Sequence, residues 1–189
     1  MAGQLDLFRP GKPLPDGFRY QPDLLSEAME RELAARLSLL PFKEFDFRGF
    51  LGKRRVVSYG WRYDFKLGKL LRADDIPEFL SPARAAAARF AGLATSELQQ
   101  ALVTEYPPGA AIGWHRDRPM FDEVVGISLL SSCTFRFRRK SGPGWQRVAL
   151  ALEPRSAYLL QGASRTEWEH SIPGVERLRY SITFRRFKA

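Results

Sequence analysis

The spacing of apolar residues in the first half of the chain follows the period of an α-helix. Between Glu27 and Leu40 this spacing predicts an amphipathic helix, which Ser26 caps and Pro41 ends. The apolar face of this helix carries Met29, Leu33, Leu37 and Leu40. Residues 42–50 then alternate between polar and apolar side chains and predict a strand.

A second helix, rich in alanine, is expected from Ser81 to about Ala91. Ser81 stands where the N-cap of this helix is expected, and Pro82 follows at the first helical position. Gly92 is expected to stop the helix.

From about residue 99 onward, apolar and polar residues alternate over short runs that proline and glycine turns separate. These runs predict eight strands: 100–106, 111–115, 124–130, 133–139, 145–152, 156–160, 167–171 and 178–187. Helices followed by many short strands are typical of a mainly β fold with flanking helices, of the α+β class. We therefore expect a β-sandwich or jelly roll with the helices packed outside.

A chain of 189 residues is expected to form one domain. Prolines and glycines crowd residues 9–22, so we expect residues 1–22 to be a flexible lead-in and 23–189 to be the single domain. No apolar run reaches the roughly 18 residues of a membrane span, and no secretory signal is visible at the N-terminus. Cys133 is the only cysteine, which excludes an intramolecular disulfide and favours a cytoplasmic location.

The net charge of +9 favours polyanionic partners, because binding a polyanion releases its counterions. Arginines occur in adjacent pairs at Arg54-Arg55, Arg138-Arg139 and Arg185-Arg186. Guanidinium groups match phosphate oxygens in geometry, which favours nucleic acid as the partner. On charge alone, a basic surface that contacts only solvent and has no specific partner is an equal alternative to nucleic-acid binding.

The chain has only two histidines, and one of them lies in a His-x-Asp motif, His115 to Asp117. Residues i and i+2 of a strand point the same way, so both side chains can bind one metal. Together with His170 they provide two imidazoles and one carboxylate, the ligand set of non-haem Fe(II) oxygenases. Zinc is an alternative metal for the same ligands.

The last predicted strand has a polar face, formed by Arg179, Ser181, Thr183 and Arg185, and an apolar face. If the polar face is buried in a sandwich, its guanidinium groups require an anion, and a dicarboxylate co-substrate would supply one. The alternative is that the polar face is solvated, which is common in antiparallel sheets. The upstream His-x-Asp motif favours the buried site.

Together these residues resemble the AlkB-type Fe(II)/2-oxoglutarate-dependent dioxygenases over roughly residues 50–187, most strongly over Tyr106–Asp117 and His170–Arg185. The resemblance implies a double-stranded β-helix (jelly-roll) core. It implies oxidative demethylation of N-alkylated bases in DNA or RNA, with release of formaldehyde, succinate and CO2. It also implies Fe(II) as the metal, with 2-oxoglutarate and O2 as co-substrates.

By this resemblance, the catalytic iron ligands are His115, Asp117 and His170. Arg179 matches the arginine that pairs with the distal carboxylate of 2-oxoglutarate, and Tyr106 matches a tyrosine that contacts the same co-substrate. Ser181 and Arg185 stand at the central and last positions of the family's Arg-x-Asn-x-Thr-x-Arg signature, and we expect them in the co-substrate site as well.

Two positions depart from the family pattern. Ser181 replaces the asparagine of the signature, and Pro119 stands where members that repair DNA often carry an acid that reads an exocyclic amine. The second departure leaves an alternative open, a 2-oxoglutarate oxygenase that acts on protein or on a small molecule. A non-catalytic nucleic-acid-binding module is a further alternative, which the intact ligand set argues against.

Aromatic and basic residues interleave from Arg54 to Phe65, in the place of the family's substrate-covering lid at about residues 50–70. Aromatic rings can stack a flipped or single-stranded base, and arginines can hold its phosphates. The expected substrate-binding residues are Tyr59, Trp61, Tyr63, Arg55 and Arg62. The alternative is an ordinary aromatic strand that packs on the core.

At the N-terminus, Gln4-Leu5-Asp6-Leu7-Phe8 is similar to the pentapeptide by which bacterial DNA-associated enzymes dock on the replication sliding clamp. Two leucines and a phenylalanine can anchor such a tail in an apolar groove of the clamp, or against the protein's own domain. We expect a monomer that has no membrane partner.

Overall fold

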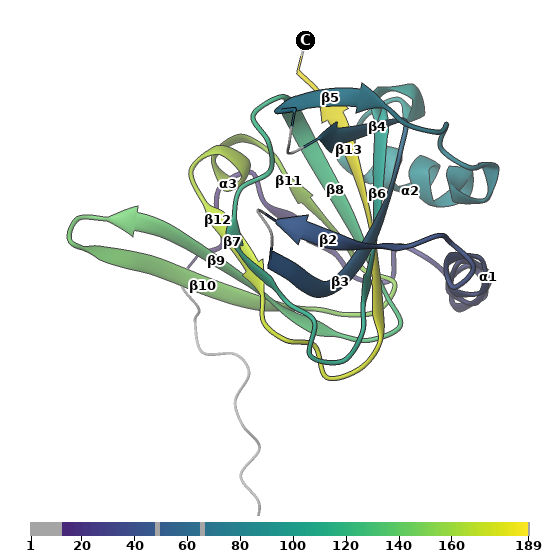
Figure 1. Cartoon of the computed structure of the whole chain (residues 1–189). Helices are drawn as coiled ribbons and strands as arrows, with labels where there is room; N and C mark the ends of the chain where they lie inside the picture. Colours follow the sequence, from purple (N-terminus) through teal and green to yellow (C-terminus); the bar gives the residue numbers. More distant parts are fainter. Residues whose placement is uncertain (1–12, 48–49, 65–66, 189) are drawn as a thin grey trace, which may run out of the picture.

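Two β-sheets face each other across the centre of the molecule (Figure 1). The computed structural model describes residues 13–47, 50–64 and 67–188. The large sheet consists, in spatial order, of β1 (Arg19–Gln21), β11 (Ala157–Leu160), β8 (Phe121–Leu129), β13 (Arg179–Phe187), β6 (Gln100–Tyr106), β3 (Phe50–Tyr59) and β2 (Lys43–Phe47). The small sheet consists of β10 (Gly144–Leu152), β9 (Cys133–Ser141), β12 (Glu169–Ile172) and β7 (Ile112–His115).

Apolar side chains fill the space between the two sheets because alternate residues of each strand point inward. Phe135 and Phe137 from the small sheet meet Tyr158 and Leu160 from the large sheet in this inner core. The arrangement is the jelly roll that the alternating pattern predicted, and the mainly β fold class is confirmed.

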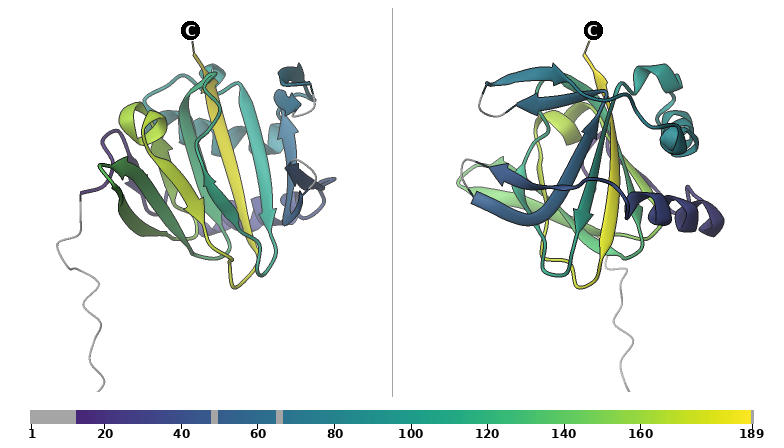
Figure 2. Two further views of the ribbon diagram at one scale, coloured as in Figure 1. Left: turned by 60° about the vertical axis from the view of Figure 1, so that its left-hand side comes forward. Right: turned by 45° about the vertical axis from the view of Figure 1, so that its right-hand side comes forward.

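The outer face of the large sheet is covered by helices (Figure 2). Helix α1 (Glu27–Leu37) and helix α2 (Ser81–Ala91) bury leucines and alanines against Val103, Ile127 and Ile182. Short 3-10 turns, η1 (Glu78–Leu80) and η2 (Thr95–Glu97), flank α2, and α3 (Gly162–Thr166) precedes β12. The prediction that the helices pack outside the sandwich is confirmed. Within the described residues, no helix is both long and apolar enough to cross a bilayer.

The two helix predictions are confirmed with corrections at their ends. Ser26 caps α1 as expected, but the helix ends at Leu37, and Leu40 packs on the core from the turn that follows. Ser81 is not the N-cap of α2, because the turn η1 runs directly into the helix and the Ser81 N–H already bonds to the Glu78 carbonyl oxygen. Gly92 ends α2 in the left-handed conformation, as expected.

The strands predicted from residue 100 onward all form within a few residues of the expected bounds, as β6 to β13. Within the expected lead-in, however, Arg19–Gln21 form β1 and pair with β11. Phe18 before them packs edge-on against Phe137, with ring centroids 5.0 Å apart. The last residues of the expected lead-in are therefore part of the sandwich.

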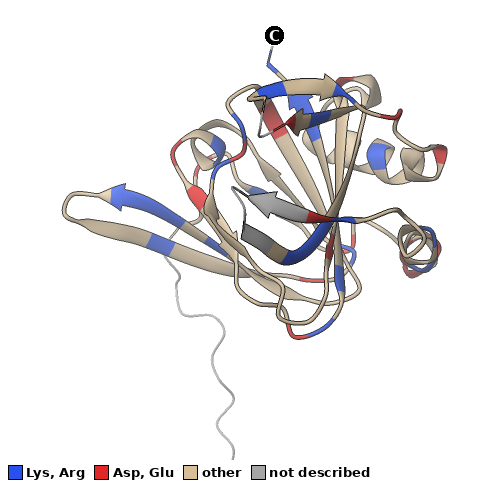
Figure 3. Ribbon diagram, in the orientation of Figure 1, with Lys and Arg blue, Asp and Glu red and all other residues tan. Residues whose placement is uncertain are grey.

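Two hairpins extend from the sandwich and carry basic residues (Figure 3). The first joins β4 (Trp61–Asp64) to β5 (Lys69–Arg72) and forms a separate two-stranded sheet. The second joins β9 to β10, and its tip extends beyond the body of the molecule (Figure 1).

Candidate metal centre and co-substrate pocket

His115 and His170 lie directly opposite each other on neighbouring antiparallel strands, β7 and β12. Their ring centroids are 4.2 Å apart. Asp117 follows β7, and its Oδ2 lies 3.6 Å from Nε2 of His170. One potential ligand atom from each of the three side chains lies within 4.8 Å of the other two, so the group can hold a metal ion. The structure thus brings together the three residues that the His-x-Asp motif and His170 suggested.

The protonation states of the three side chains suit metal binding. Nδ1 of His115 lies 2.8 Å from the carbonyl oxygen of Gly113, so this nitrogen carries the proton and Nε2 is left for a metal. Burial lowers the pKa of His115 and, with the neighbouring His115 ring, lowers the pKa of His170 to about 3. Both imidazoles are therefore neutral at pH 7. Burial alone would raise the pKa of Asp117, but the Arg185 guanidinium and both imidazoles outweigh it and hold that pKa well below its usual range.

Two arginines position the segment that carries Asp117. Nε and Nη2 of Arg185 both lie 2.8 Å from Oδ1 of Asp117, and Nη1 donates to Oε1 of Gln100 at 3.0 Å. The buried Arg165 donates from Nη2 to the carbonyl oxygens of Arg118 and Phe121. Arg185, expected in the co-substrate site, lines the pocket as well, but its fork is directed at the carboxylate of Asp117.

The three ligand side chains open into a pocket between the two sheets. Its described lining residues are Arg54, Leu102, Thr104, Tyr106, Ile112, His115, Asp117, Phe135, Tyr158, His170, Ile172, Ser181, Thr183 and Arg185. Tyr106 and Ser181, both expected to contact the co-substrate, therefore line the same pocket as the three potential metal ligands. The polar face of β13 is buried rather than solvated, since Ser181 is 5% exposed and Thr183 6% exposed.

Arg179 is fully buried at the start of the same face of β13. Its Nε donates to Oγ of Ser128 at 2.9 Å, and its guanidinium carbon lies 5.0 Å from the centroid of the Tyr106 ring. Within the described residues, Nη1 and Nη2 have no hydrogen-bond partner. A buried guanidinium with two unused donors is costly unless an anion binds it. The donors therefore fit one carboxylate of 2-oxoglutarate, and the two imidazoles and one carboxylate nearby fit Fe(II).

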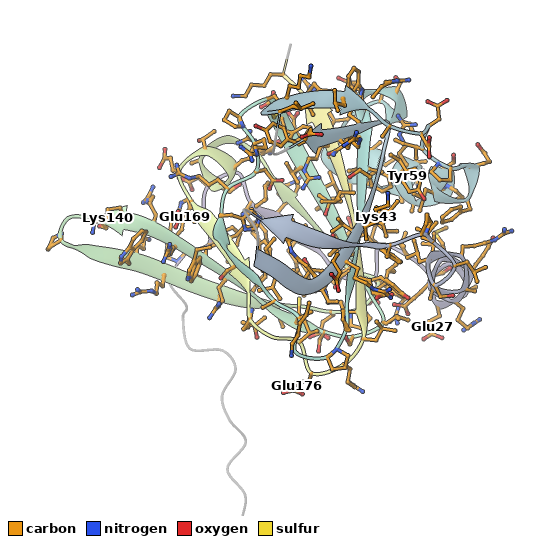
Figure 4. The ribbon with its side chains drawn as sticks, viewed as in Figure 1. Glu27, Lys43, Tyr59, Lys140, Glu169 and Glu176 are labelled. Carbon is orange, nitrogen blue, oxygen red and sulfur yellow. The ribbon has the colours of Figure 1, made fainter. Side chains whose placement is uncertain are left out.

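Two of the expected substrate residues, Arg55 and Tyr59, face away from the pocket. Both lie on β3, where alternate residues point to opposite faces of the sheet. Arg55 donates from Nε to Oε1 of Glu105 at 2.8 Å, and Tyr59 is buried in the core beneath the helices (Figure 4). These two predictions are wrong. The neighbouring Arg54 is the residue that lines the pocket, where it hydrogen-bonds to Tyr106.

Gly60 separates Tyr59 from the aromatic residues that follow it. Its φ of +73° breaks the strand, and an added Cβ would lie 2.3 Å from the carbonyl oxygen of Gln99. The side-chain alternation of β3 therefore does not continue into β4, so residues of equal spacing on the two strands need not share a face.

The other three expected substrate residues lie on the β4–β5 hairpin. Tyr63 stacks on the guanidinium of Arg118, next to Asp117, at 4.0 Å from the ring centroid. Trp61 packs edge-on against Phe187, with centroids 5.8 Å apart. Arg62 lies on the opposite face of the hairpin, is largely exposed, and pairs with Asp64 at 3.5 Å. Tyr63 therefore contacts the segment that carries Asp117, and Phe65 is outside the described residues.

Comparisons with known proteins agree with this geometry. A family model described as the 2OG-Fe(II) oxygenase superfamily matches residues 17–185. An Arabidopsis thaliana protein named alkylated DNA repair protein ALKBH8 homolog is 31% identical over 178 residues, which cover 80% of this chain and 49% of that protein. A Xenopus tropicalis protein named tRNA (carboxymethyluridine(34)-5-O)-methyltransferase alkbh8 is 26% identical over 164 residues, which cover 84% of this chain and 25% of that protein.

The chain thus spans about half the length, or less, of the curated relatives it matches. A solved structure described as "The structure of OsALKBH1" covers 93% of this chain and 100% of its own, with a TM-score of 0.68 and 17% identity, and supports the fold alone. The family uses Fe(II), 2-oxoglutarate and O2. The chain belongs to the 2OG-Fe(II) oxygenase superfamily.

Proposed function

We propose that this dioxygenase demethylates N-alkylated bases in DNA or RNA. The observation that carries the proposal is the group of His115, Asp117 and His170 together with Arg179, whose buried donors are unpartnered within the described residues and which lies on the face of β13 that also lines the pocket. The names of the Arabidopsis and Xenopus relatives, one a DNA repair protein and the other a tRNA methyltransferase, favour nucleic acid as the substrate class. The net charge of +9 supports the same class.

In this proposal His115, Asp117 and His170 hold Fe(II), and Arg185 keeps Asp117 ionised and oriented. Arg179 binds one carboxylate of 2-oxoglutarate through Nη1 and Nη2, beside Tyr106 and Ser181. Iron with 2-oxoglutarate and O2 supplies the oxidation of a methyl carbon on nitrogen, with succinate and CO2 as co-products. The hydroxymethyl group on nitrogen then leaves as formaldehyde and restores the base.

The protein contributes orientation and exclusion of water. Phe135, Ile112 and Ile172 form an apolar wall beside the two imidazoles. In this proposal Tyr63, which stacks on Arg118, covers or stacks the target base. Trp61 packs against Phe187 and holds the lid hairpin on the body. In this proposal Arg62, on the opposite, exposed face of the hairpin, contacts a phosphate.

The proposal is tested with a panel of single-stranded DNA and RNA oligonucleotides that each carry one methylated base, including a tRNA anticodon-loop sequence. After incubation with Fe(II), 2-oxoglutarate and O2, mass spectrometry measures loss of the methyl group and a second assay measures formaldehyde. We expect demethylation with the wild-type protein and none with His115→Ala. Succinate formation without a change in any oligonucleotide would favour the alternative, a protein or small-molecule substrate.

Three further parts of the proposal concern the setting in which the enzyme works. The single cysteine supports a reducing, cytoplasmic location, and we propose a monomer. Residues 4–8, Gln4 to Phe8, lie outside the described residues, so sliding-clamp binding stays a prediction. It is tested with a peptide of residues 1–12 and purified clamp, and undetectable binding at high micromolar peptide would remove it.

A further inference from the structure

The outer face of the small sheet carries a cluster of tryptophans and basic residues. Opposite residues of paired strands share a face, so Lys140 lies beside Trp145 and Arg138 beside Arg147. Trp114 of β7 joins the same face through its contacts with Arg136 and Arg138. We call this cluster the hairpin face; it consists of Trp114, Arg136, Arg138, Lys140, Trp145 and Arg147.

The hairpin face is built as a stack in which rings and cations alternate. The guanidinium carbon of Arg138 lies 4.6 Å from the Trp114 ring centroid and 4.3 Å from the Trp145 ring centroid. Nζ of Lys140 lies 5.3 Å from the same Trp145 ring. Glu169 accepts a hydrogen bond from Nε of Arg138 at 2.5 Å, which holds this arginine in place between the two rings. The Arg138 guanidinium, fixed by Glu169, therefore packs against the Trp145 ring and holds it in place.

The outer members of the hairpin face are available to a partner. Trp145 is 38% exposed, and Lys140 and Arg147 are exposed beside it. Figure 4 labels Lys140 near the tip of the β9–β10 hairpin and Glu169 at its base. In the part of the chain that the structure describes, no acidic side chain pairs with Lys140 or Arg147. The sheet core does not require these residues, since Phe135 and Phe137 fill the opposite face.

An exposed, supported indole ring between unpaired cations matches the chemistry of single-stranded nucleic acid. Unpaired bases stack on aromatic rings, and lysine and arginine neutralise the adjacent phosphates. A base pair inside a duplex does not expose its ring face to Trp145, so the stacking component favours a single strand.

We propose that the hairpin face is a second contact site, outside the pocket, for the single-stranded nucleic acid that flanks the target nucleotide. The inference rests on the proposed function for the identity of the substrate. Strand β7 links the two sites, because its Trp114 points outward to the hairpin face while its His115 points inward to the metal ligands. A single-stranded nucleic acid with one nucleotide in the pocket can thus continue across the β7 edge of the sheet, where Arg116 is exposed.

The test measures binding of a labelled single-stranded 12-mer that carries no methylated base, by fluorescence anisotropy at several salt concentrations. The charge variant is Lys140→Glu with Arg147→Glu. Its matched control is Arg31→Glu with Arg89→Glu, which removes the same charge from exposed positions of α1 and α2, on the helix side of the molecule. We expect at least tenfold weaker binding for the charge variant and less than a twofold change for the control.

Salt dependence and a ring variant separate the two components of binding. The charge variant should lower the slope of log affinity against log salt by about 1.4, at about 0.7 for each lost contact to a single strand. Trp145→Ala should weaken binding by roughly fivefold or more and leave that slope unchanged, because stacking carries no charge. Circular dichroism melting checks that each variant is folded.

The inference is overturned if the charge variant binds like its control, or if a duplex of the same sequence binds as well and Trp145→Ala has no effect. Displacement of the probe by polyglutamate as readily as by unlabelled oligonucleotide would also overturn it, since a general polyanion surface would explain that result. The probe contains no substrate base, so this outcome does not depend on catalysis. If the variants lost binding but the wild type demethylated no oligonucleotide, the proposed function would be rejected. The hairpin face would still be supported as a binding site for single-stranded nucleic acid.

Discussion

Two donors of Arg185 converge on one oxygen of Asp117. Nε and Nη2 are both 2.8 Å from Oδ1, whereas Oδ2 faces Nε2 of His170 at 3.6 Å. One oxygen is therefore held by the protein, and the other is directed at the place where the ligand atoms converge. The carboxylate is ionised and oriented before any metal binds.

Replacement of Arg185 by methionine should leave the buried Asp117 carboxylate without its cation. We expect the free energy of unfolding of the metal-free protein to fall by roughly 3–5 kcal/mol, the usual cost of breaking a buried ion pair. The control is Arg186→Met, since Arg186 is more exposed and its nearest acid, Glu123, is 3.4 Å away. Its loss should cost about 1 kcal/mol or less. Urea denaturation measures both values, and equal losses would contradict the role given to Arg185.

Arg179 is expected to lower the stability of the 2-oxoglutarate-free protein and to bind the co-substrate. With no anion bound, its two unused donors destabilise the fold, so Arg179→Met should keep or raise the melting temperature of the 2-oxoglutarate-free protein. The same variant should no longer be stabilised by 2-oxoglutarate, because the bidentate contact is lost. Thermal melts with and without 2-oxoglutarate test both statements. If 2-oxoglutarate raised the melting temperature of the variant as much as that of the wild type, the co-substrate would bind elsewhere.

Much of the fold can be predicted from the alternation of polar and apolar residues along single strands. The metal ligands can be predicted in the same way, because residues i and i+2 of a strand point to the same side. The burial of Ser181 and Thr183 and the orientation of Arg179 follow from one strand lying between two layers. The alternation of this strand predicts its two faces, but the His-x-Asp motif is needed to favour burial of the polar face. The partner of Arg185 could not be predicted in this way, because Asp117 comes from a distant segment and the pairing depends on how β13 lies relative to the end of β7.

The substrate side was harder to predict because adjacent residues carry similar chemistry. Arg54 and Arg55 differ only in which face of β3 they occupy, and the pairing of β3 with β6 decides this. The strand break at Gly60 then ends the alternation that would otherwise put Tyr59 and Tyr63 on the same face. A conformation of +73° at a glycine cannot be read from the alternation of neighbouring aromatics.

The stability of the metal-free protein should fall as the pH is lowered from 7.5 to 5. Both histidines have folded-state pKa values below the ordinary 6.5, so the unfolded chain binds more protons than the folded chain in this range. Their contribution is fully present above pH 6.5 and is lost below it, at up to about 1.4 kcal/mol per pH unit for each histidine. The lowered pKa of Asp117 contributes only below its ordinary value of 3.8, outside this range.

Urea denaturation after chelator treatment, at pH 7.5, 6.0 and 5.0, measures this dependence. His170→Gln removes one of the two groups and should reduce the pH dependence by about half. An unchanged dependence in this variant would mean that other groups cause the loss of stability.

The pocket is expected to prefer a neutral methylated base over a positively charged one. Among its described lining residues Asp117 is the one carboxylate, and Arg185 already neutralises it. Arg54 adds a further cation beside Tyr106, and Pro119 provides no acid near the mouth. A cationic base such as 1-methyladenine would be repelled by the Arg54 guanidinium, which disfavours it by roughly tenfold against neutral 3-methylthymine.

Arg54→Gln should narrow that preference, since it removes the cation and keeps a hydrogen-bond donor near Tyr106. The matched control is Arg55→Gln, on the same strand, because Arg55 pairs with Glu105 on the other face of the sheet. Competition assays with both methylated oligonucleotides in one reaction give the ratio of kcat/KM values directly. The two variants differ by one position in sequence, so a change confined to Arg54→Gln would assign the preference to the pocket charge. An equal change of the kcat/KM ratio in both variants would mean that the ratio depends on the stability of β3 instead.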